Sequence, residues 1–226
     1  PVARWAPPPS AFIDVKGQIV HIRDEGPRGD PSSPTPPIVL LHGTGASLHT
    51  WEGWVRTLKK TRRVITFDMP GFGLTGPFSG QYAADDYRGD AYARFVLDVL
   101  DALKVGSAVI GGNSLGGEVS WRAATLEPSR FTGLLLIDAS GYALTPGSIP
   151  LGFRIARIPL ANRIGEHLLP RALVAASVAN VYADDSRITE GLVDRYYELT
   201  LREGNRRALG FRMQQLEPGA AISRLK

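Results

Sequence analysis

A serine set between glycines is the residue in this chain best placed to act as a nucleophile. The apolar run from Ala108 to Gly111 predicts a strand, and the pattern G-N-S-L-G follows at residues 112–116. Glycines at 112 and 116 allow a sharp turn from a strand into a helix, because they remove the Cβ atoms that would clash there. We therefore expect Ser114 to present its hydroxyl as a nucleophile. The alternative is a glycine-rich turn in which Ser114 is a bystander.

The loop H-G-T-G at residues 42–45 follows another apolar run and is the second candidate part of a site. We expect the backbone N–H of Thr44, together with that of Leu115 at the start of the helix, to stabilise an oxyanion. His42 and Gly43 are expected to border the substrate. His42 is expected to hold the loop by hydrogen bonds, and not to act as a general base.

Apolar side chains near these residues are candidates for a substrate pocket. Trp51 and Trp54 follow the loop, where they either line an acyl or aromatic pocket or pack the first helix into the core. Later residues either cover an apolar substrate or seal a lid onto the body: Leu151, Phe153, Ile155, Ile158, Leu168, Leu169, Leu173 and Val174.

The elements that would position these residues follow from the spacing of apolar residues. Four apolar runs, at 38–41, 64–67, 108–111 and 134–137, predict strands buried on both faces. Helical patterns at 85–103 and 115–126 alternate with them, which predicts a mostly parallel sheet with flanking helices. Strands at 12–15 and 18–23 around Lys16-Gly17 predict an early hairpin.

The ends of the chain have a different character from the predicted sheet. Residues 1–10 are rich in proline and predict an extended lead-in on the surface. Beyond residue 141, helical patterns at 172–181 and 192–201 are separated by prolines, and no buried strand is predicted. We expect residues 1–140 to form an α/β core and residues 141–226 a helical cap.

The composition is that of an ordinary globular protein. Of the 226 residues 43% are hydrophobic and 21% charged, and the formal net charge is +4. The basic residues are scattered, so we expect no nucleic-acid partner. The chain contains no cysteine, which excludes disulfides and thiolate ligands, and we expect neither metal nor cofactor. No apolar run is long enough to span a membrane. A cytoplasmic location is favoured, with export or membrane anchoring left open because the chain starts at Pro1 without Met.

Three motifs together resemble the α/β-hydrolase superfamily. They are HGTG at 42–45, DMPGFG at 68–73 and GNSLGG at 112–117, in that order along the chain. The resemblance covers residues 11–140 well and residues 141–226 more loosely. A serine at 114 argues against the dehalogenase and epoxide-hydrolase branches, and the GNSLGG form is similar to carboxylesterases and to C–C bond hydrolases of aromatic-ring breakdown. Asp68, in the second motif, is expected to cap backbone N–H groups.

The resemblance also implies an acid and a base that are harder to place. In the family the order along the chain is serine, acid, histidine, with the last two on strands and loops after the cap. Asp138, at the end of the predicted strand 134–137, is a candidate acid, since a minority of the superfamily carry it there; otherwise it is a surface or capping residue. His21, His49 and His167 are expected to be structural. We therefore expect the base to lie beyond Lys226 and the last strands to be absent.

The resemblance implies a serine hydrolase that cleaves an ester or related acyl bond of a small apolar substrate. A C–C bond hydrolase acting on a vinylogous keto acid is an alternative, for which Arg154 and Arg157 are candidate carboxylate contacts. A second alternative is a binding protein of the same fold without catalysis. A sheet lacking its last strands would expose an edge, so we also expect a homodimer or a second chain to complete it.

Overall fold

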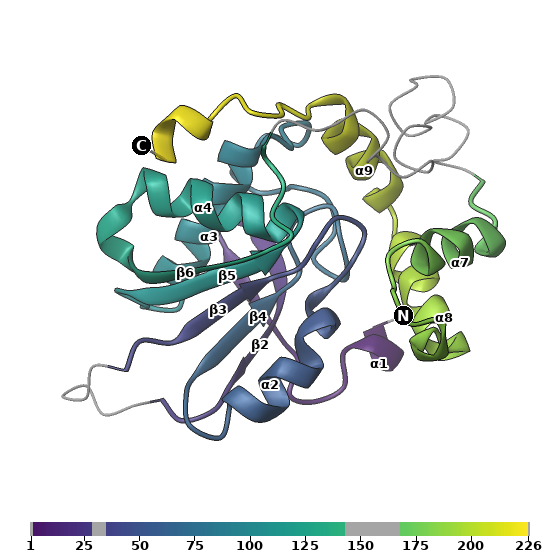
Figure 1. Ribbon diagram of the computed structural model, residues 1–226, viewed down its shortest axis with the longest axis horizontal. Helices are drawn as coiled ribbons and strands as arrows, with labels where there is room; N and C mark the ends of the chain where they lie inside the picture. Colours follow the sequence, from purple (N-terminus) through teal and green to yellow (C-terminus); the bar gives the residue numbers. More distant parts are fainter. Residues whose placement is uncertain (1, 29–34, 143–167, 226) are drawn as a thin grey trace.

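The computed structural model describes residues 2–28, 35–142 and 168–225, and its centre is a six-stranded sheet (Figure 1). The order in the sheet is β1-β2-β4-β3-β5-β6. β4, β3, β5 and β6 are parallel, and β1 and β2 join them as an antiparallel hairpin. The predicted mostly parallel α/β sheet is therefore confirmed. The strands are β1 (Ala11–Val15), β2 (Gln18–Glu25), β3 (Ile38–Leu41), β4 (Val64–Phe67), β5 (Ala108–Asn113) and β6 (Phe131–Ile137).

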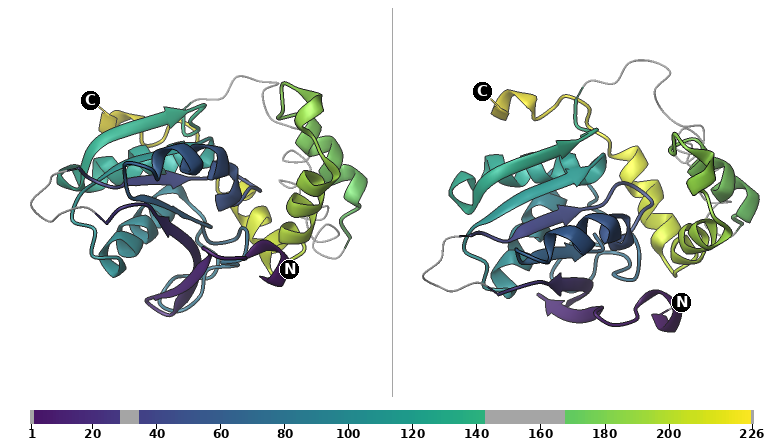
Figure 2. Two further views of the ribbon diagram at one scale, coloured as in Figure 1. Left: turned by 90° about the horizontal axis from the view of Figure 1, so that it is seen from below. Right: turned by 60° about the horizontal axis from the view of Figure 1, so that its bottom comes forward.

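Helices cover both faces of this sheet. α3 and α4 pack together on one face, and α2 lies on the other (Figures 1 and 2). The helices of the described residues are α1 (Val2–Trp5), α2 (Glu52–Leu58), α3 (Gly89–Ala102), α4 (Leu115–Leu126), α7 (Arg171–Ala179), α8 (Glu190–Thr200) and α9 (Asn205–Gln214). Short 3-10 turns are η1 (Leu48–Trp51), η2 (Pro128–Arg130), η3 (Asp185–Arg187) and η4 (Ile222–Leu225).

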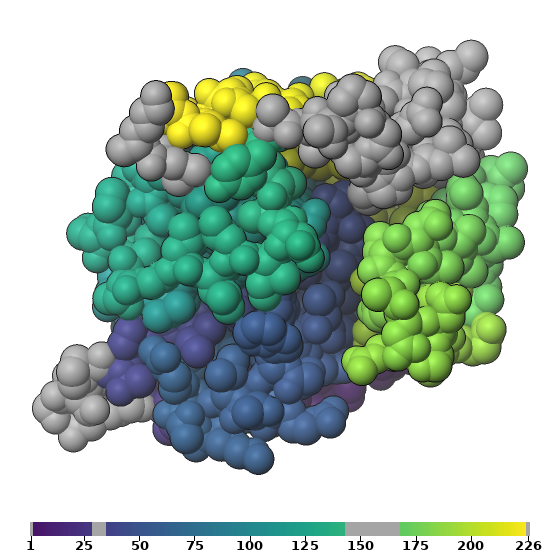
Figure 3. All heavy atoms as spheres, viewed as in Figure 1, coloured from purple at the N-terminus to yellow at the C-terminus, as the bar shows by residue number. Residues whose placement is uncertain are grey.

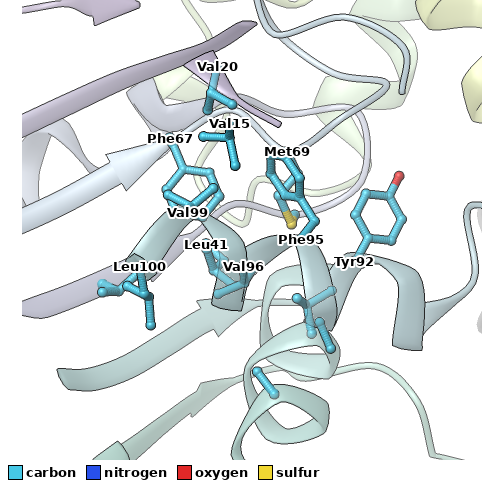
Figure 4. Close-up of a cluster of buried hydrophobic side chains, with 14 of the residues drawn as sticks. Val15, Val20, Leu41, Phe67, Met69, Tyr92, Phe95, Val96, Val99 and Leu100 are labelled. Atoms are coloured by element: carbon cyan, nitrogen blue, oxygen red, sulfur yellow. The ribbon is translucent and has the colours of Figure 1, made fainter. Parts of the chain in front are cut away.

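β3 and β4 are buried on both faces, whereas β6 alternates between half-buried and exposed residues, so the prediction that 134–137 is buried on both faces is wrong. In β3, Val39 and Leu41 join the larger core beneath α3 and α4, whereas Leu40 joins a smaller core beneath α2. Aromatic and aliphatic side chains of α3, among them Phe95 and Val99, fill the larger core against β4 (Figure 4). The alternation of the strand and the spacing of the helix thus place the two sets of apolar residues in contact.

The early hairpin turns where the sequence predicts it. Lys16 and Gly17 both have positive φ, 52° and 84°, between β1 and β2. The second position favours glycine because such angles are strained for side chains with a Cβ.

The amino-terminal lead-in differs from the prediction of an extended segment. Val2–Trp5 forms the helix α1, which lies beside α8 (Figure 1). Arg4 is hydrogen-bonded to Glu198 and Asp194, and the indole N–H of Trp5 also donates to Glu198, at 2.6 Å. These contacts come from α8, nearly two hundred residues away, so local sequence could not indicate them.

The carboxyl-terminal helices lie off the ends of the parallel strands, towards which the strand arrowheads point (Figure 2). α7 and α8 correspond to the two helices expected at 172–181 and 192–201, and within residues 168–225 the structure contains no strand. α9 was not predicted. It packs back on the core, where Ala208 is buried. β6 pairs only with β5 among the described strands, and Leu134 and Leu136 on it are exposed.

Candidate active site

Ser114 lies in a strained turn between β5 and α4. Its φ of 52° and ψ of −116° fall where residues with a Cβ rarely occur. The turn is held on both sides: the N–H of Ser114 donates to Ile137 at 3.1 Å, and its carbonyl accepts from Glu118 and Ser140. The side chain remains partly exposed. The first turn of α4 begins at this residue, so the positive end of the helix faces the hydroxyl.

Two glycines make the turn sterically feasible. A Cβ at Gly116 would overlap the carbonyl group of Leu41, at the end of β3. A Cβ at Gly112 would overlap the backbone of Gly116. Helix α4 therefore approaches the strands more closely than any residue with a side chain would allow.

The H-G-T-G loop lies directly against this turn. A Cβ built on Gly43 would be 3.4 Å from the Cβ of Ser114 and 2.9 Å from the side-chain oxygen of Asn113. Thr44, the next residue, is half-buried. The loop is thus adjacent to the serine, as an oxyanion donor must be. The assignment of the N–H groups of Thr44 and Leu115 as those donors stays a prediction.

His42 is fully buried and bonded within the loop structure. Its Nε2 accepts the N–H of Met69 at 2.9 Å, so Nδ1 carries the proton and donates to the carbonyl of Gly43 at 2.8 Å. Burial lowers the pKa of His42 despite the nearby Asp68 carboxylate. The imidazole is therefore neutral, and both of its nitrogens are occupied away from Ser114.

Asp68 joins three segments beneath the loop. Its carboxylate accepts the N–H of Leu48 and that of Leu74, both at 2.7 Å, and the Nδ1–H of His21 at 2.7 Å. Burial disfavours the charge, but these hydrogen bonds hold the pKa of Asp68 below its ordinary value. Asp68 is thus an ionised, fully buried cap of backbone N–H groups.

None of the three described histidines is bonded to Ser114. Besides His42, His21 contacts Asp68 and Ser10, and His49 contacts Ser47 and the carbonyl of Trp5. His167 lies outside the described residues. The general base is therefore not assigned within the described part of the chain.

Asp138 sits close to the turn but has an exposed side chain. It follows β6 with a φ of 45°. The preceding residue, Ile137, accepts the N–H of Ser114, and Ser140 donates its N–H to the carbonyl of Ser114. No hydrogen bond to the Asp138 carboxylate occurs among the described residues. Its role as triad acid stays a prediction.

The two tryptophans occupy different environments. Trp51 is 2% exposed and lies in the core beneath α2, with Leu40 and Val55. Trp54 is 45% exposed, and its ring meets that of Trp51 edge-on at 5.7 Å. Trp51 therefore packs in the core, while Trp54 faces outward from α2.

The predicted lid residues divide between the described and undescribed parts of the chain. Leu168 and Leu173 are exposed, and Leu169 and Val174 are half-buried. The candidates at 151–158, including Arg154 and Arg157, lie outside the described residues. Figure 3 shows a hollow between the green helices α7 and α8 and the body of the molecule. A small cavity of about 20 Å³ lies where loop residues Gly45 and Phe72 meet Leu199 of α8 and Asn205 of α9.

A buried group of charged side chains behind Ser114 was not predicted from the sequence. Glu118, one turn after the serine, bonds Arg212 of α9 at 2.6 Å, Arg122 at 3.0 Å and the hydroxyl of Ser140 at 3.1 Å. The signal was a Glu–Arg pair four residues apart, Glu118 and Arg122, within a helix whose other residues carry no charge. The partner on α9 is 94 residues away and could not be read from local pattern.

Comparison with known proteins identifies the family. Residues 36–156 match the family described as alpha/beta hydrolase fold. The chain is 34% identical over 116 residues to 2-hydroxymuconate semialdehyde hydrolase of Pseudomonas sp. (strain CF600), covering 49% of this chain and 40% of the relative. It is 35% identical over 151 residues to 2-hydroxy-6-oxo-2,4-heptadienoate hydrolase of Pseudomonas putida, covering 64% of this chain and 53% of the relative. The chain thus spans about half the length of the curated relatives it matches.

A solved structure supports the same fold. Cfl2 from Burkholderia cenocepacia superposes with a TM-score of 0.76 at 20% identity, covering 96% of this chain and 74% of that one. At this identity the likeness concerns the fold alone. With the family match over residues 36–156, it shows that the chain belongs to the alpha/beta hydrolase fold family.

Proposed function

We propose that this protein is a serine hydrolase in which Ser114 attacks an ester or related acyl bond of a small apolar substrate. The observation that carries the proposal is the backbone of Ser114, a residue with a Cβ at φ 52° and ψ −116°. Such strain persists only where the surrounding structure imposes it, and it clusters at catalytic positions. The neighbouring loop at 42–45 supports the same function.

The proposed reaction proceeds through an acyl-enzyme. The hydroxyl of Ser114 attacks the acyl carbon and gives its proton to a histidine outside the described residues. The N–H groups of Thr44 and Leu115 stabilise the oxyanion, a contribution of about 10²–10³ in rate per donor. The leaving group departs with the proton, and water then hydrolyses the ester on Ser114.

Hydrolysis of a C–C bond is a second candidate function. The curated relatives named above, a 2-hydroxymuconate semialdehyde hydrolase and a 2-hydroxy-6-oxo-2,4-heptadienoate hydrolase, favour it. In that case the substrate is a vinylogous keto acid, and cationic contacts hold its carboxylate, for which Arg154 and Arg157 are the candidates. Neither function requires a metal or a cofactor.

The test combines a fluorophosphonate probe with two substrate classes on the natural protein. We expect an adduct on Ser114, located by peptide mapping and absent from position 114 in Ser114→Ala, and turnover of either short nitrophenyl esters or a 2-hydroxy-6-oxo-dienoate. Turnover of the dienoate with little esterase activity would select the C–C reaction. A folded protein with no adduct and no turnover would overturn the proposal and favour a binding protein of the same fold.

A further inference from the structure

A second serine in this chain is bonded to a histidine and a buried carboxylate. Ser10, before β1, has its hydroxyl 2.9 Å from Nε2 of His21 on β2. Nδ1 of the same imidazole is 2.7 Å from Oδ2 of Asp68, which follows β4. His21 and Asp68 are fully buried, whereas Ser10 is half-buried. The three groups therefore have the connectivity of a serine–histidine–aspartate triad, apart from Ser114.

The hydrogen bonds fix the direction of proton transfer. Asp68 is an ionised acceptor because two backbone N–H groups also donate to it. In the neutral imidazole of His21, the proton therefore resides on Nδ1. Nε2 is left as an acceptor for the hydroxyl proton of Ser10. This is the tautomer that a general base needs.

A cation contacts the hydroxyl of Ser10, and a hollow lies beside the neighbouring residue Pro9. Nε of Arg23 donates to Oγ of Ser10 at 3.0 Å, which stabilises negative charge developing on that oxygen. Arg23 and Pro9, the neighbour of Ser10, line a surface hollow of about 340 Å³. The other lining residues include Arg56, Lys59 and Glu52. The hollow has room for a small acyl ester beside Pro9 and Arg23, the two residues that link it to Ser10.

We propose that Ser10 is a second base-activated nucleophile, which accepts an acyl group from small activated esters. Oγ forms the new bond to the acyl carbon as the bond to the leaving oxygen breaks. The proton of the hydroxyl passes to Nε2 of His21 and from there to the leaving group. The product is an acyl ester on Ser10. This reactivity is independent of Ser114 and of the function proposed for it.

The chain contains a matched comparison in Ser47 and His49. The hydroxyl of Ser47 is 3.0 Å from Nδ1 of His49, but Nε2 of that ring donates to the carbonyl of Trp5 and not to a carboxylate. Burial lowers the pKa of His49 to about 4, which makes it a weak base. Ser47 is also buried. A serine–histidine contact alone therefore predicts no reactivity at Ser47.

The experiment measures acetylation by p-nitrophenyl acetate in the Ser114→Ala protein, with the modified serine located by peptide mapping. We expect one acetyl group, on Ser10, and none on Ser47 or on the exposed Ser177. His21→Gln should slow the labelling about 100-fold or more, which is the usual contribution of a general base. Ser10→Ala should abolish it.

The outcomes separate this inference from the function proposed for Ser114. Acetylation of Ser10 no faster than that of Ser177 would overturn the inference, whether or not Ser114 is reactive. In the same measurement on the protein that retains Ser114, labelling of Ser10 without labelling of Ser114 would overturn only the proposed function. If His21→Gln does not fold, Arg23→Gln provides the same test, with slower labelling expected because it removes the donor to Oγ.

Discussion

Replacing Ser114 by glycine should give a more stable protein than replacing it by alanine. Both Ser114→Gly and Ser114→Ala remove the hydroxyl, so the two variants differ only in how well the new residue tolerates the backbone angles at position 114. At φ 52° and ψ −116° alanine keeps the strain imposed by its Cβ, whereas glycine relieves it. The comparison therefore isolates the conformational cost of presenting a side chain at this turn.

The size of the difference follows from two opposing terms. A residue with a Cβ in such a region costs on the order of 1–3 kcal/mol. Glycine loses more freedom on folding than alanine, which costs roughly 0.5–1 kcal/mol. Taking the middle of each range, Ser114→Gly should be more stable than Ser114→Ala by about 1 kcal/mol.

A second serine in the same helix supplies the control. Ser120 has ordinary helical geometry, and its hydroxyl bonds the carbonyl of Gly116. There Ser120→Gly should be less stable than Ser120→Ala by roughly 1 kcal/mol, the reverse of the order at 114. Urea unfolding followed by circular dichroism measures both differences. Equal stability of the two Ser114 variants, or the same order at both sites, would show that the backbone at Ser114 is not strained.

Three further predictions concern buried charges. Asp68→Asn should lower the free energy of unfolding by about 3 kcal/mol in urea titrations, because its amide cannot accept all three hydrogen bonds. Arg212→Met should cost about 3 kcal/mol, because it removes one of the two cations that pair with buried Glu118 and leaves Arg122 as the other. Burial lowers the pKa of His49 from 6.5 to about 4, so between these pH values the unfolded chain binds a proton at His49 more readily than the folded protein does. As the pH is lowered through that window, the free energy of unfolding should fall by up to about 1.4 kcal/mol per pH unit, and less steeply in His49→Gln.

The sequence predicts the strands of the sheet well because each is a local apolar run, which can be recognised without knowing the strand that it pairs with. β3 and β4 begin and end at the expected residues, since each is a short apolar run buried on both faces. Helix α4 is also found at its predicted bounds, from the residue after Ser114 to the residue before Glu127-Pro128. α3 begins at Gly89, later than expected, because Asp86 bonds the backbone and side chain of Arg88 in a local turn.

The elements that the sequence misses are those held by polar contacts from afar. α9 buries Asn205 and Arg212, which an apolar periodicity cannot reveal. Asn205 donates to the carbonyl of Gly73, 132 residues away. α1 is short and is held by Glu198 of α8. In both cases the helix depends on a partner that only the folded chain brings close.

The same limit applies to the site. Glycines and a serine at fixed spacing predict the turn at Ser114, because the steric requirement is local. The grouping of Ser10, His21 and Asp68 depends on the pairing of β1 with β2 and of β2 with β4. Nothing in the spacing of these three residues along the chain indicates that they meet.

The turn after β4 ties the two serine sites together. Asp68 holds His21 beside Ser10, and the next residue, Met69, donates its N–H to His42 in the loop beside Ser114. A change at Asp68 therefore disturbs both sites at once and cannot distinguish their roles. Changes at Ser10 and Ser114 act on one hydroxyl each. Because the two serines share no hydrogen-bond partner among the described residues, their effects on labelling should be independent.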